Sequence, residues 1–307
     1  MNTAFLFPGQ GSQRVGMLHD LPEDPATPRV LHEMSRVLGF DILTLDSETA
    51  LQSTVAVQLA LLASGVSTAQ TLIDRGVVPI AVLGMSVGSF AAAVIADVIS
   101  LRDATVLVRS RAQQMEHLFP KGYGMAAVIG LSERQVQQIA SEVNSAAAPV
   151  FVSNINTPSQ IDISGAIPAM DEVLRRSLAQ GARKVELLHV AVPSHCPLME
   201  PIARSLQEQM ASLELHAPKM VYVANVNGRA VRSAETVALD LANNIAHGVR
   251  WHDANVVARE LGSELFLEMP PGHVLSNLLH ESDPTVSAYP VSRSSVTWYV
   301  QLSRQQA

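Results

Sequence analysis

Residues 82–92 of this 307-residue chain read VLGMSVGSFAA. A short apolar run at 80–83 meets a G-x-S-x-G pentapeptide, and an alanine-rich run that favours a helix follows it. Such an arrangement is typical of a nucleophile elbow, in which a serine, here Ser86, sits on a sharp turn between a strand and a helix. Gly84 and Gly88 suit that turn because a side chain at either position would collide where strand and helix cross closely. We therefore predict that Ser86 is held out for nucleophilic attack.

The alternation of strands and helices around the elbow predicts an α/β core. Strands are expected at 4–7, 80–84, 220–224 and 264–268, and helices at 28–38, 51–74, 88–98, 101–118, 198–213, 233–245, 252–261 and 273–280. Because strands and helices alternate, the sheet is expected to be largely parallel.

The middle of the chain has a different order of elements. Strands are expected there at 125–130, 149–154, 160–164 and 183–190, and helices after Ser132 and at 168–180. The resulting order, βαββαβ, is that of a ferredoxin-like unit. We therefore predict a large α/β domain formed by residues 1–123 and 193–307, with a ferredoxin-like small domain, 124–192, inserted into it.

The composition is that of a globular protein, with 48% hydrophobic and 16% charged residues. A net charge of −7 argues against a general nucleic-acid-binding or anionic-membrane surface. Cys196 is the single cysteine, which excludes an intrachain disulfide framework and suits a reducing compartment. The N-terminal segment lacks the basic stretch of a signal peptide, and we expect no apolar run of membrane-spanning length. We therefore expect a cytoplasmic protein that binds neither nucleic acid nor membranes.

Arg111 is expected to lie on the buried face of the helix at 101–118. It belongs to a stripe with i+3 and i+4 spacing, whose other members are Ala104, Val108, Met115 and Leu118. An inward guanidinium needs a partner, because burying an unpaired charge is costly. Two interpretations remain open at this point. One is a structural salt bridge or a snorkelling contact, and the other is a fork that binds a substrate carboxylate bidentately.

His195 lies in the loop 192–197, which reads VPSHCP and is stiffened by two prolines. A lone histidine is more often structural, but an elbow serine needs a base, and a rigid loop can present one to Ser86. Cys196 is poorly placed for activation by its own neighbour, so we interpret it as a small packing residue. Metal-ligand spacings, Walker patterns and G-x-G-x-x-G patterns are missing from the sequence, so we expect no metal and no bound nucleotide cofactor.

Several separated stretches together resemble one family. They are FLFPGQGSQ at 5–13, G-x-S-x-G at 84–88, Arg111 followed by Met115, PSHC at 193–196, and Pro-Gly at 271–272. In this order they resemble the malonyl-CoA:acyl-carrier-protein transacylase family over nearly the whole chain. The resemblance implies an α/β-hydrolase-like large domain with a ferredoxin-like insert.

The resemblance also implies roles for single residues. Ser86 would accept the malonyl group as an ester, and His195 would act as general base and then as the acid that protonates the leaving thiolate. The main-chain N–H groups of Gln10 and Val87 would form the oxyanion hole. Arg111 would bind the free carboxylate of the malonyl group.

Four further positions follow from the same resemblance. Gln58, Asn154 and Asn156 would line the substrate site. The pair of serine and histidine lacks an acidic third member in this family, so a main-chain carbonyl in the 249–251 loop, at Arg250, would orient the histidine. Malonyl-CoA is then a substrate, and no cofactor is bound.

The elbow departs from the pattern of the fatty-acid branch, which usually reads GHSLGE. Met85, Val87 and Ser89 differ from it, and Arg250 stands where that branch usually has glutamine. GMSVG is more similar to the transacylase (epsilon) subunit of malonate decarboxylase, which implies that a small carrier subunit with a phosphopantetheine-like thiol is the acceptor. The alternatives are a malonyl-CoA:acyl-carrier-protein transacylase of fatty-acid or polyketide synthesis, a serine hydrolase, and a non-catalytic carrier-docking subunit.

Overall fold

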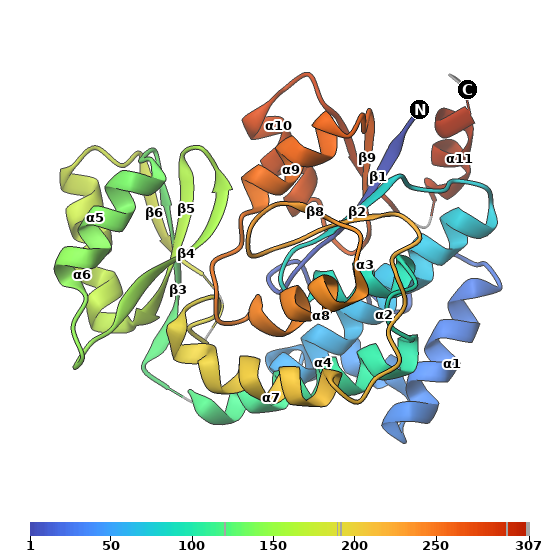
Figure 1. Cartoon of the computed structure of the whole chain (residues 1–307), viewed down its shortest axis with the longest axis horizontal. Coiled ribbons are helices and arrows are strands. Elements are labelled where there is room, and N and C mark those ends of the chain that lie inside the picture. Colours follow the sequence, from blue (N-terminus) through green and yellow to red (C-terminus); the bar gives the residue numbers. More distant parts are fainter. Residues whose placement is uncertain (120, 189, 191, 293, 305–307) are drawn as a thin grey trace.

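The computed structural model describes residues 1–304 except 120, 189, 191 and 293. Figure 1 shows a large body built on one sheet and a smaller body, drawn in green, beside it. The large sheet has the strand order β10-β9-β1-β2-β7-β8. Its strands are β1 (Thr3–Phe7), β2 (Ala81–Gly84), β7 (Val221–Val223), β8 (Ala230–Val231), β9 (Leu265–Glu268) and β10 (Ser287–Pro290). Neighbouring strands are parallel except β7 and β8, so the predicted α/β fold with a largely parallel sheet is confirmed.

Helices cover both faces of the large sheet. They are α1 (Ala26–Leu38), α2 (Thr54–Asp74), α3 (Gly88–Ile95), α4 (Leu101–Leu118), α7 (Glu200–Met210), α8 (Ala234–Asn243), α9 (Trp251–Glu260), α10 (Val274–Ser282) and α11 (Val296–Arg304). Short 3-10 turns occupy Ile42–Asp46, Ala50–Gln52 and Pro197–Met199. One apolar core packs α1, α2, α3, α4, α7 and α8 against one face, and a second packs α9 and α10 against the other. This two-sided cover suits a parallel sheet, whose strands are buried on both faces.

The helix α4 begins and ends where the sequence predicts. Its N-cap is Ser100, whose hydroxyl accepts a hydrogen bond from the N–H of Asp103 at 3.0 Å. This bond satisfies one of the free N–H groups of the first turn. The register of α4 is therefore set locally, and it turns Arg111 inward, as the periodicity predicts.

The helix α2 corrects one expectation from the sequence. Its 21 residues are long and apolar enough to cross a membrane by length and composition. In the structure, however, 89% of its most apolar window is buried inside the protein, between α1, α3 and α4. Helices that are apolar on all sides are typical of the centre of a large core as well as of membranes. We therefore interpret α2 as the central core helix.

The small body contains a four-stranded antiparallel sheet with the order β4-β5-β3-β6. Its elements are β3 (Tyr123–Ile129), α5 (Glu133–Val143), β4 (Val150–Thr157), β5 (Gln160–Ala166), α6 (Ile167–Ala179) and β6 (Lys184–Leu187). This is the ferredoxin-like arrangement expected from the sequence. The Ser132–Gln135 capping box at the start of α5 is present as predicted. We propose residues 124–192 as the small domain. β3 begins one residue before this range, and the last residue of the range, Val192, already packs in the core of the large body, so each limit lies within one residue of the observed change.

The two faces of the small sheet have different partners. Val128 and Ile161 lie opposite each other on β3 and β5 and pack with α5 and α6, which cover the outer face (Figure 1). The next pair along these strands, Ala127 and Asp162, points to the other face because side chains alternate across a strand. A polar residue of the small sheet is thereby turned toward the large body.

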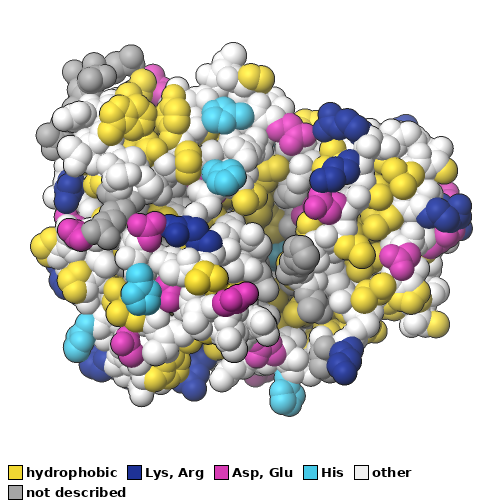
Figure 2. Space-filling model, turned by 180° about the vertical axis from the view of Figure 1, so that it is seen from behind, with side chains coloured by type: hydrophobic (Ala, Val, Ile, Leu, Met, Phe, Trp, Pro, Cys, Tyr) yellow, Lys and Arg dark blue, Asp and Glu magenta, His cyan; other side chains and the backbone are white. Residues whose placement is uncertain are grey.

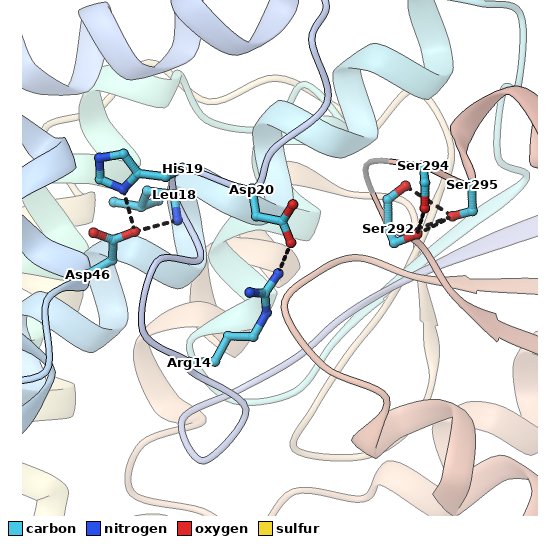
Figure 3. Close-up of polar contacts among 8 residues, drawn as sticks. All are labelled: Arg14, Leu18, His19, Asp20, Asp46, Ser292, Ser294 and Ser295. Atoms are coloured by element: carbon cyan, nitrogen blue, oxygen red, sulfur yellow. Dashed lines mark hydrogen bonds and ion pairs between the residues drawn. The ribbon is translucent and has the colours of Figure 1, made fainter.

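The loop that leaves β1 is braced by polar contacts (Figure 3). The Asp46 carboxylate accepts a hydrogen bond from the N–H of Leu18 at 2.8 Å and lies 3.0 Å from Nδ1 of His19. Arg14 forms an ion pair with Asp20 in the same loop. These contacts hold the chain that follows the FPGQGSQ segment against the first 3-10 turn.

Two elements near the C-terminus were not predicted, β10 and α11. Hydroxyl contacts among Ser292, Ser294 and Ser295 form the turn before α11 (Figure 3). The helix returns the chain to the N-terminus, where the amino group of Met1 donates to the carbonyl of Ser303 at 3.3 Å. Their sequences carry weak patterns, because β10 has four residues and α11 mixes polar and aromatic side chains.

Candidate active site

Ser86 sits on the turn between β2 and α3 with a φ of 55°. This left-handed conformation is uncommon for a residue with a side chain and marks a sharp, locally strained turn. The glycines beside it have no room for a side chain. A Cβ at Gly84 would lie 2.2 Å from the main-chain N of Ser89, and one at Gly88 would lie 2.1 Å from the carbonyl oxygen of Phe7. The turn therefore has the elbow geometry that the sequence predicts.

His195 contacts Ser86 directly. Its Nε2 lies 2.8 Å from the Ser86 Oγ, and its Nδ1 lies 2.5 Å from the main-chain carbonyl oxygen of Asn244. A carbonyl can only accept, so Nδ1 carries the proton and Nε2 is free to accept the hydroxyl proton of Ser86. Burial and the nearby Arg111 charge lower the pKa of His195 to about 4. At neutral pH the imidazole is therefore uncharged, as a general base requires.

The prediction that the main chain at Arg250 orients the histidine is wrong. The carbonyl of Arg250 accepts from the N–H of Ala254 at 3.0 Å, as the first hydrogen bond of α9. A helix uses the carbonyl of its N-cap residue in this way, and Nδ1 of His195 is bonded to the carbonyl of Asn244 instead. The Arg250 side chain instead bridges the two bodies, with 2.6 Å ion pairs to Glu133 at the start of α5 and to Asp253.

Asn244 therefore takes the orienting role, and its side chain ties it to the elbow. The Asn244 Nδ2 donates to the Ser89 Oγ at 2.8 Å, and the Ser89 hydroxyl donates to the carbonyl of Ser86 at 2.5 Å. The group that fixes the base is thereby joined to the turn that carries the nucleophile. The sequence analysis missed this residue, because nothing in the pattern of α8 distinguishes its last turn.

Asn225 is a second brace that the sequence analysis missed. Its Oδ1 accepts from the N–H of Ser86 at 2.9 Å, and its Nδ2 donates to the carbonyl of Gly84 at 2.7 Å. The buried Asp240 carboxylate fixes this turn by accepting the N–H of Asn225 at 3.0 Å. A signal was available in the sequence, since Asn225 follows a strand predicted for the same sheet, and the carboxyl ends of parallel strands meet at one edge.

Arg111 is fully buried beside the nucleophile. Its Nη2 donates to the Ser86 Oγ at 3.0 Å, and its Nη1 donates to the Gln58 Oε1 at 2.7 Å and to the Met115 Sδ at 3.4 Å. Desolvation lowers the pKa of the guanidinium to about 9, so it remains charged at neutral pH. No carboxylate among the described residues forms an ion pair with it, and its Nε has no partner there. The structural salt bridge is thereby excluded for the described residues, and full burial excludes snorkelling.

Gln10 lies in a loop that approaches the elbow closely and lines the same cavity as Ser86. A Cβ at the preceding Gly9 would be 2.8 Å from the Met85 carbonyl oxygen and 3.5 Å from the Ser86 Cβ, so only glycine allows this approach. Within the described part of the chain, the N–H groups of Gln10 and Val87 donate to no protein acceptor. Two free N–H groups beside a serine are the requirement of an oxyanion hole. Their role stays a prediction.

A cavity of about 280 Å³ opens between the two bodies, with Ser86 and His195 in its wall. Figure 2 shows the surface hollowed where they meet. The predicted substrate-site residues Gln58, Asn154 and Asn156 all line this cavity, and so does Asp162, which the sequence analysis missed. The small sheet therefore contributes polar side chains to the wall of the cavity that contains Ser86 and His195.

Two further observations concern Cys196 and the side chains that could bind a metal. The Cys196 thiol is buried, donates to the carbonyl of Pro193 at 3.1 Å, and has its pKa raised by that burial. A buried, protonated thiol is a packing group. Within residues 1–304, leaving aside the four positions named above, no three His, Cys, Asp or Glu residues are grouped as a metal site would need.

Comparison with known proteins gives one answer. A family model described as "Acyl transferase domain" matches residues 4–297. The malonyl CoA-acyl carrier protein transacylases of Staphylococcus aureus (strain MW2) and Escherichia coli (strain K12) are 35% and 33% identical to the chain. The alignments cover 90% and 95% of this chain and 91% and 96% of the relatives.

Solved structures agree with these relatives. The transacylase from Coxiella burnetii has a TM-score of 0.93 at 30% identity, covering 98% of this chain and 97% of its own. A malonyl-transacylase solved in complex with a type II PKS acyl-carrier protein also has a TM-score of 0.93, at 33% identity, with 98% and 100% covered. These matches name no malonate decarboxylase subunit, so that branch stays a prediction. The chain belongs to the malonyl-CoA:acyl-carrier-protein transacylase family of acyl transferases.

Proposed function

We propose that this protein transfers malonyl from malonyl-CoA to the thiol of an acyl carrier protein through a malonyl ester of Ser86. The Ser86 Oγ attacks the thioester carbonyl carbon while its proton passes to Nε2 of His195. The resulting oxyanion is stabilised by the N–H groups of Gln10 and Val87. When the tetrahedral intermediate collapses, the C–S bond breaks, and His195 returns the proton to the departing thiolate.

The second half-reaction reverses these steps with a different thiol. His195 takes the proton of the carrier thiol, whose sulfur attacks the Ser86 ester, and the serine leaves as a hydroxyl protonated by His195. Both halves need a neutral imidazole with a free Nε2, which the bond to Asn244 and the lowered pKa provide. No metal or resident cofactor enters either half.

The observation that carries the choice of malonyl is the unpaired Arg111. A buried guanidinium without a described counter-ion, whose Nη2 lies 3.0 Å from the nucleophilic oxygen, favours an acyl group that brings its own carboxylate. Gln58 holds one arm of the fork in place. Acetyl and longer alkyl groups would leave the charge unpaired, which is costly in a buried site.

The acceptor is best assigned to fatty-acid or polyketide synthesis. The similar proteins include transacylases named for acyl carrier protein and one bound to a polyketide carrier protein. A malonate decarboxylase carrier is the second candidate, supported by the GMSVG elbow at residues 84–88. In both cases we propose a cytoplasmic location, which suits a chain whose single cysteine, Cys196, forms no disulfide.

The test is labelling of the protein after brief exposure to malonyl-CoA. Intact mass should rise by one malonyl group, and Ser86→Ala should abolish the gain, whereas Ser141→Ala on the exposed side of α5 should not. Labelling of Ser86→Ala would refute the serine ester. Transfer rates to a fatty-acid carrier and to a malonate decarboxylase carrier then decide the branch, and rapid release of free malonate without any carrier would indicate a hydrolase.

A further inference from the structure

The cavity wall formed by the small sheet contains a buried carboxyl group that the chemistry above does not use. Asp162 of β5 is 4% exposed, and its Oδ2 accepts from the Nδ2 of Asn154 at 3.0 Å and of Asn156 at 2.9 Å. All three side chains line the same cavity as Ser86. The cluster therefore belongs to the wall along which a substrate must pass.

Asp162 sets the orientation of both asparagine side chains. With the amides turned the other way, two carbonyl oxygens would face a carboxylate oxygen, and acceptors repel one another. In the observed orientation each Nδ2 is used by Asp162, and each Oδ1 is left over. Oδ1 of Asp162 and the Oδ1 atoms of both asparagines have no partner among the described residues.

Three unpartnered acceptors in one buried cluster indicate a ligand that brings donors. Leaving a buried polar atom unsatisfied costs free energy that a ligand hydrogen bond would recover. None of the described Lys, Arg or His side chains forms an ion pair with Asp162. Its pKa is raised to about 6 by burial, so the carboxylate is largely ionised at neutral pH and offers acceptors alone.

The opposite charges of Arg111 and Asp162 favour different ends of a malonyl thioester. Arg111 attracts the malonyl carboxylate, and the negative Asp162 repels carboxylate and phosphate groups. The part of the substrate that can bind beside Asp162 is therefore neutral and rich in N–H donors. In a coenzyme A or carrier thioester, that part is the pantetheine arm, whose secondary amides follow the sulfur.

We propose that Asp162, together with Asn154 and Asn156, binds the amide N–H groups of the pantetheine arm and so recognises the thiol carrier of the substrate. This rests on the proposed function, because it assumes that a thioester reaches Ser86. Arg111 then selects the acyl group, and Asp162 selects the arm. The two ends of the substrate are recognised from different bodies of the protein.

The experiment compares two acyl donors, malonyl-pantetheine and the same compound with both amide nitrogens methylated, which removes the donors. Labelling of Ser86 is followed by rapid quench and intact mass for the wild type, Asp162→Asn and the matched control Asp171→Asn, which is exposed on α6. We expect the wild type and the control to prefer the unmethylated donor by roughly 10-fold or more in kcat/KM, the size expected for a charge-assisted hydrogen bond. Asp162→Asn should reduce this preference to within about twofold, mainly through KM.

Two results would overturn the proposal. One is a wild type that labels equally fast with both donors, which needs no variant and is independent of folding. The other is a preference that Asp162→Asn keeps while both of its rates fall together, which would show a structural role only. Absence of Ser86 labelling with either donor in the wild type would instead refute the proposed function itself.

Discussion

Replacement of Arg111 by alanine tests the substrate choice most directly. The guanidinium donates to the Ser86 Oγ at 3.0 Å and is held by Gln58 at 2.7 Å, so a carboxylate bound there gains a fixed, desolvated cation. Losing a bidentate charged contact should cost about 2–4 kcal/mol of transition-state stabilisation, which corresponds to roughly 30- to 1,000-fold in kcat/KM for malonyl-CoA. Acetyl-CoA has no carboxylate, so its rate should change by less than about threefold.

The assay is the initial rate of Ser86 acylation with malonyl-CoA and acetyl-CoA, measured by rapid quench. Arg102→Ala is the matched control, because Arg102 lies exposed on the same helix, α4. Equal losses of rate with both acyl donors would refute the reasoning, since they would show that Arg111 stabilises the site without binding the malonyl carboxylate.

A stability measurement on Arg111→Met separates the same two interpretations. Breaking a buried ion pair costs about 3–5 kcal/mol, because it leaves the other charge unpaired. Arg111 has no described counter-ion, and its buried charge opposes folding, as its lowered pKa of about 9 indicates. We therefore expect the free energy of unfolding of Arg111→Met to be no lower than that of the wild type. A loss of several kcal/mol in urea denaturation would contradict this.

Three further predictions concern the base, its brace and the carboxyl group of the cavity wall. Because the pKa of His195 is lowered to about 4, the acylation rate should stay constant from pH 8 down to about pH 5 and fall only below that; an inflection near the ordinary histidine value of about 6.5 would contradict the buried, neutral imidazole. Asn225→Ala should lower the acylation rate at saturating malonyl-CoA by about 10-fold or more with little change in KM, since it removes two hydrogen bonds that hold the elbow. An unchanged rate would show that the elbow keeps its conformation without these two bonds. Asp162 has a folded pKa of about 6, above its unfolded value of 3.8, so the folded state binds more protons between these values. The contribution of Asp162 to stability should therefore fall by about 2 kcal/mol as the pH rises from about 4 to about 6.5, and Asp162→Asn should remove that contribution from denaturation curves.

Features that depend only on neighbouring residues could be predicted from the amino-acid sequence. The elbow could be predicted because Gly84 and Gly88 lie where a Cβ would meet main-chain atoms, which is a local steric requirement. The inward position of Arg111 followed from the 3.6-residue period of α4, and the cap at Ser100 set its register. The parallel sheet followed from the alternation of strands and helices, since such connections leave few other topologies.

Contacts between groups that are far apart in the sequence could be seen only in the folded structure. The base is oriented by Asn244, 49 residues from His195, and not at Arg250, whose carbonyl α9 uses for its own first turn. Asn225 reaches Ser86 over 139 residues, and Asp162 meets the asparagines only because the small sheet turns one polar face to the cavity. A pattern along the chain shows which face a residue occupies. It does not show which main-chain groups on other segments remain free to bond with it, because the intervening helices and turns use most of them first.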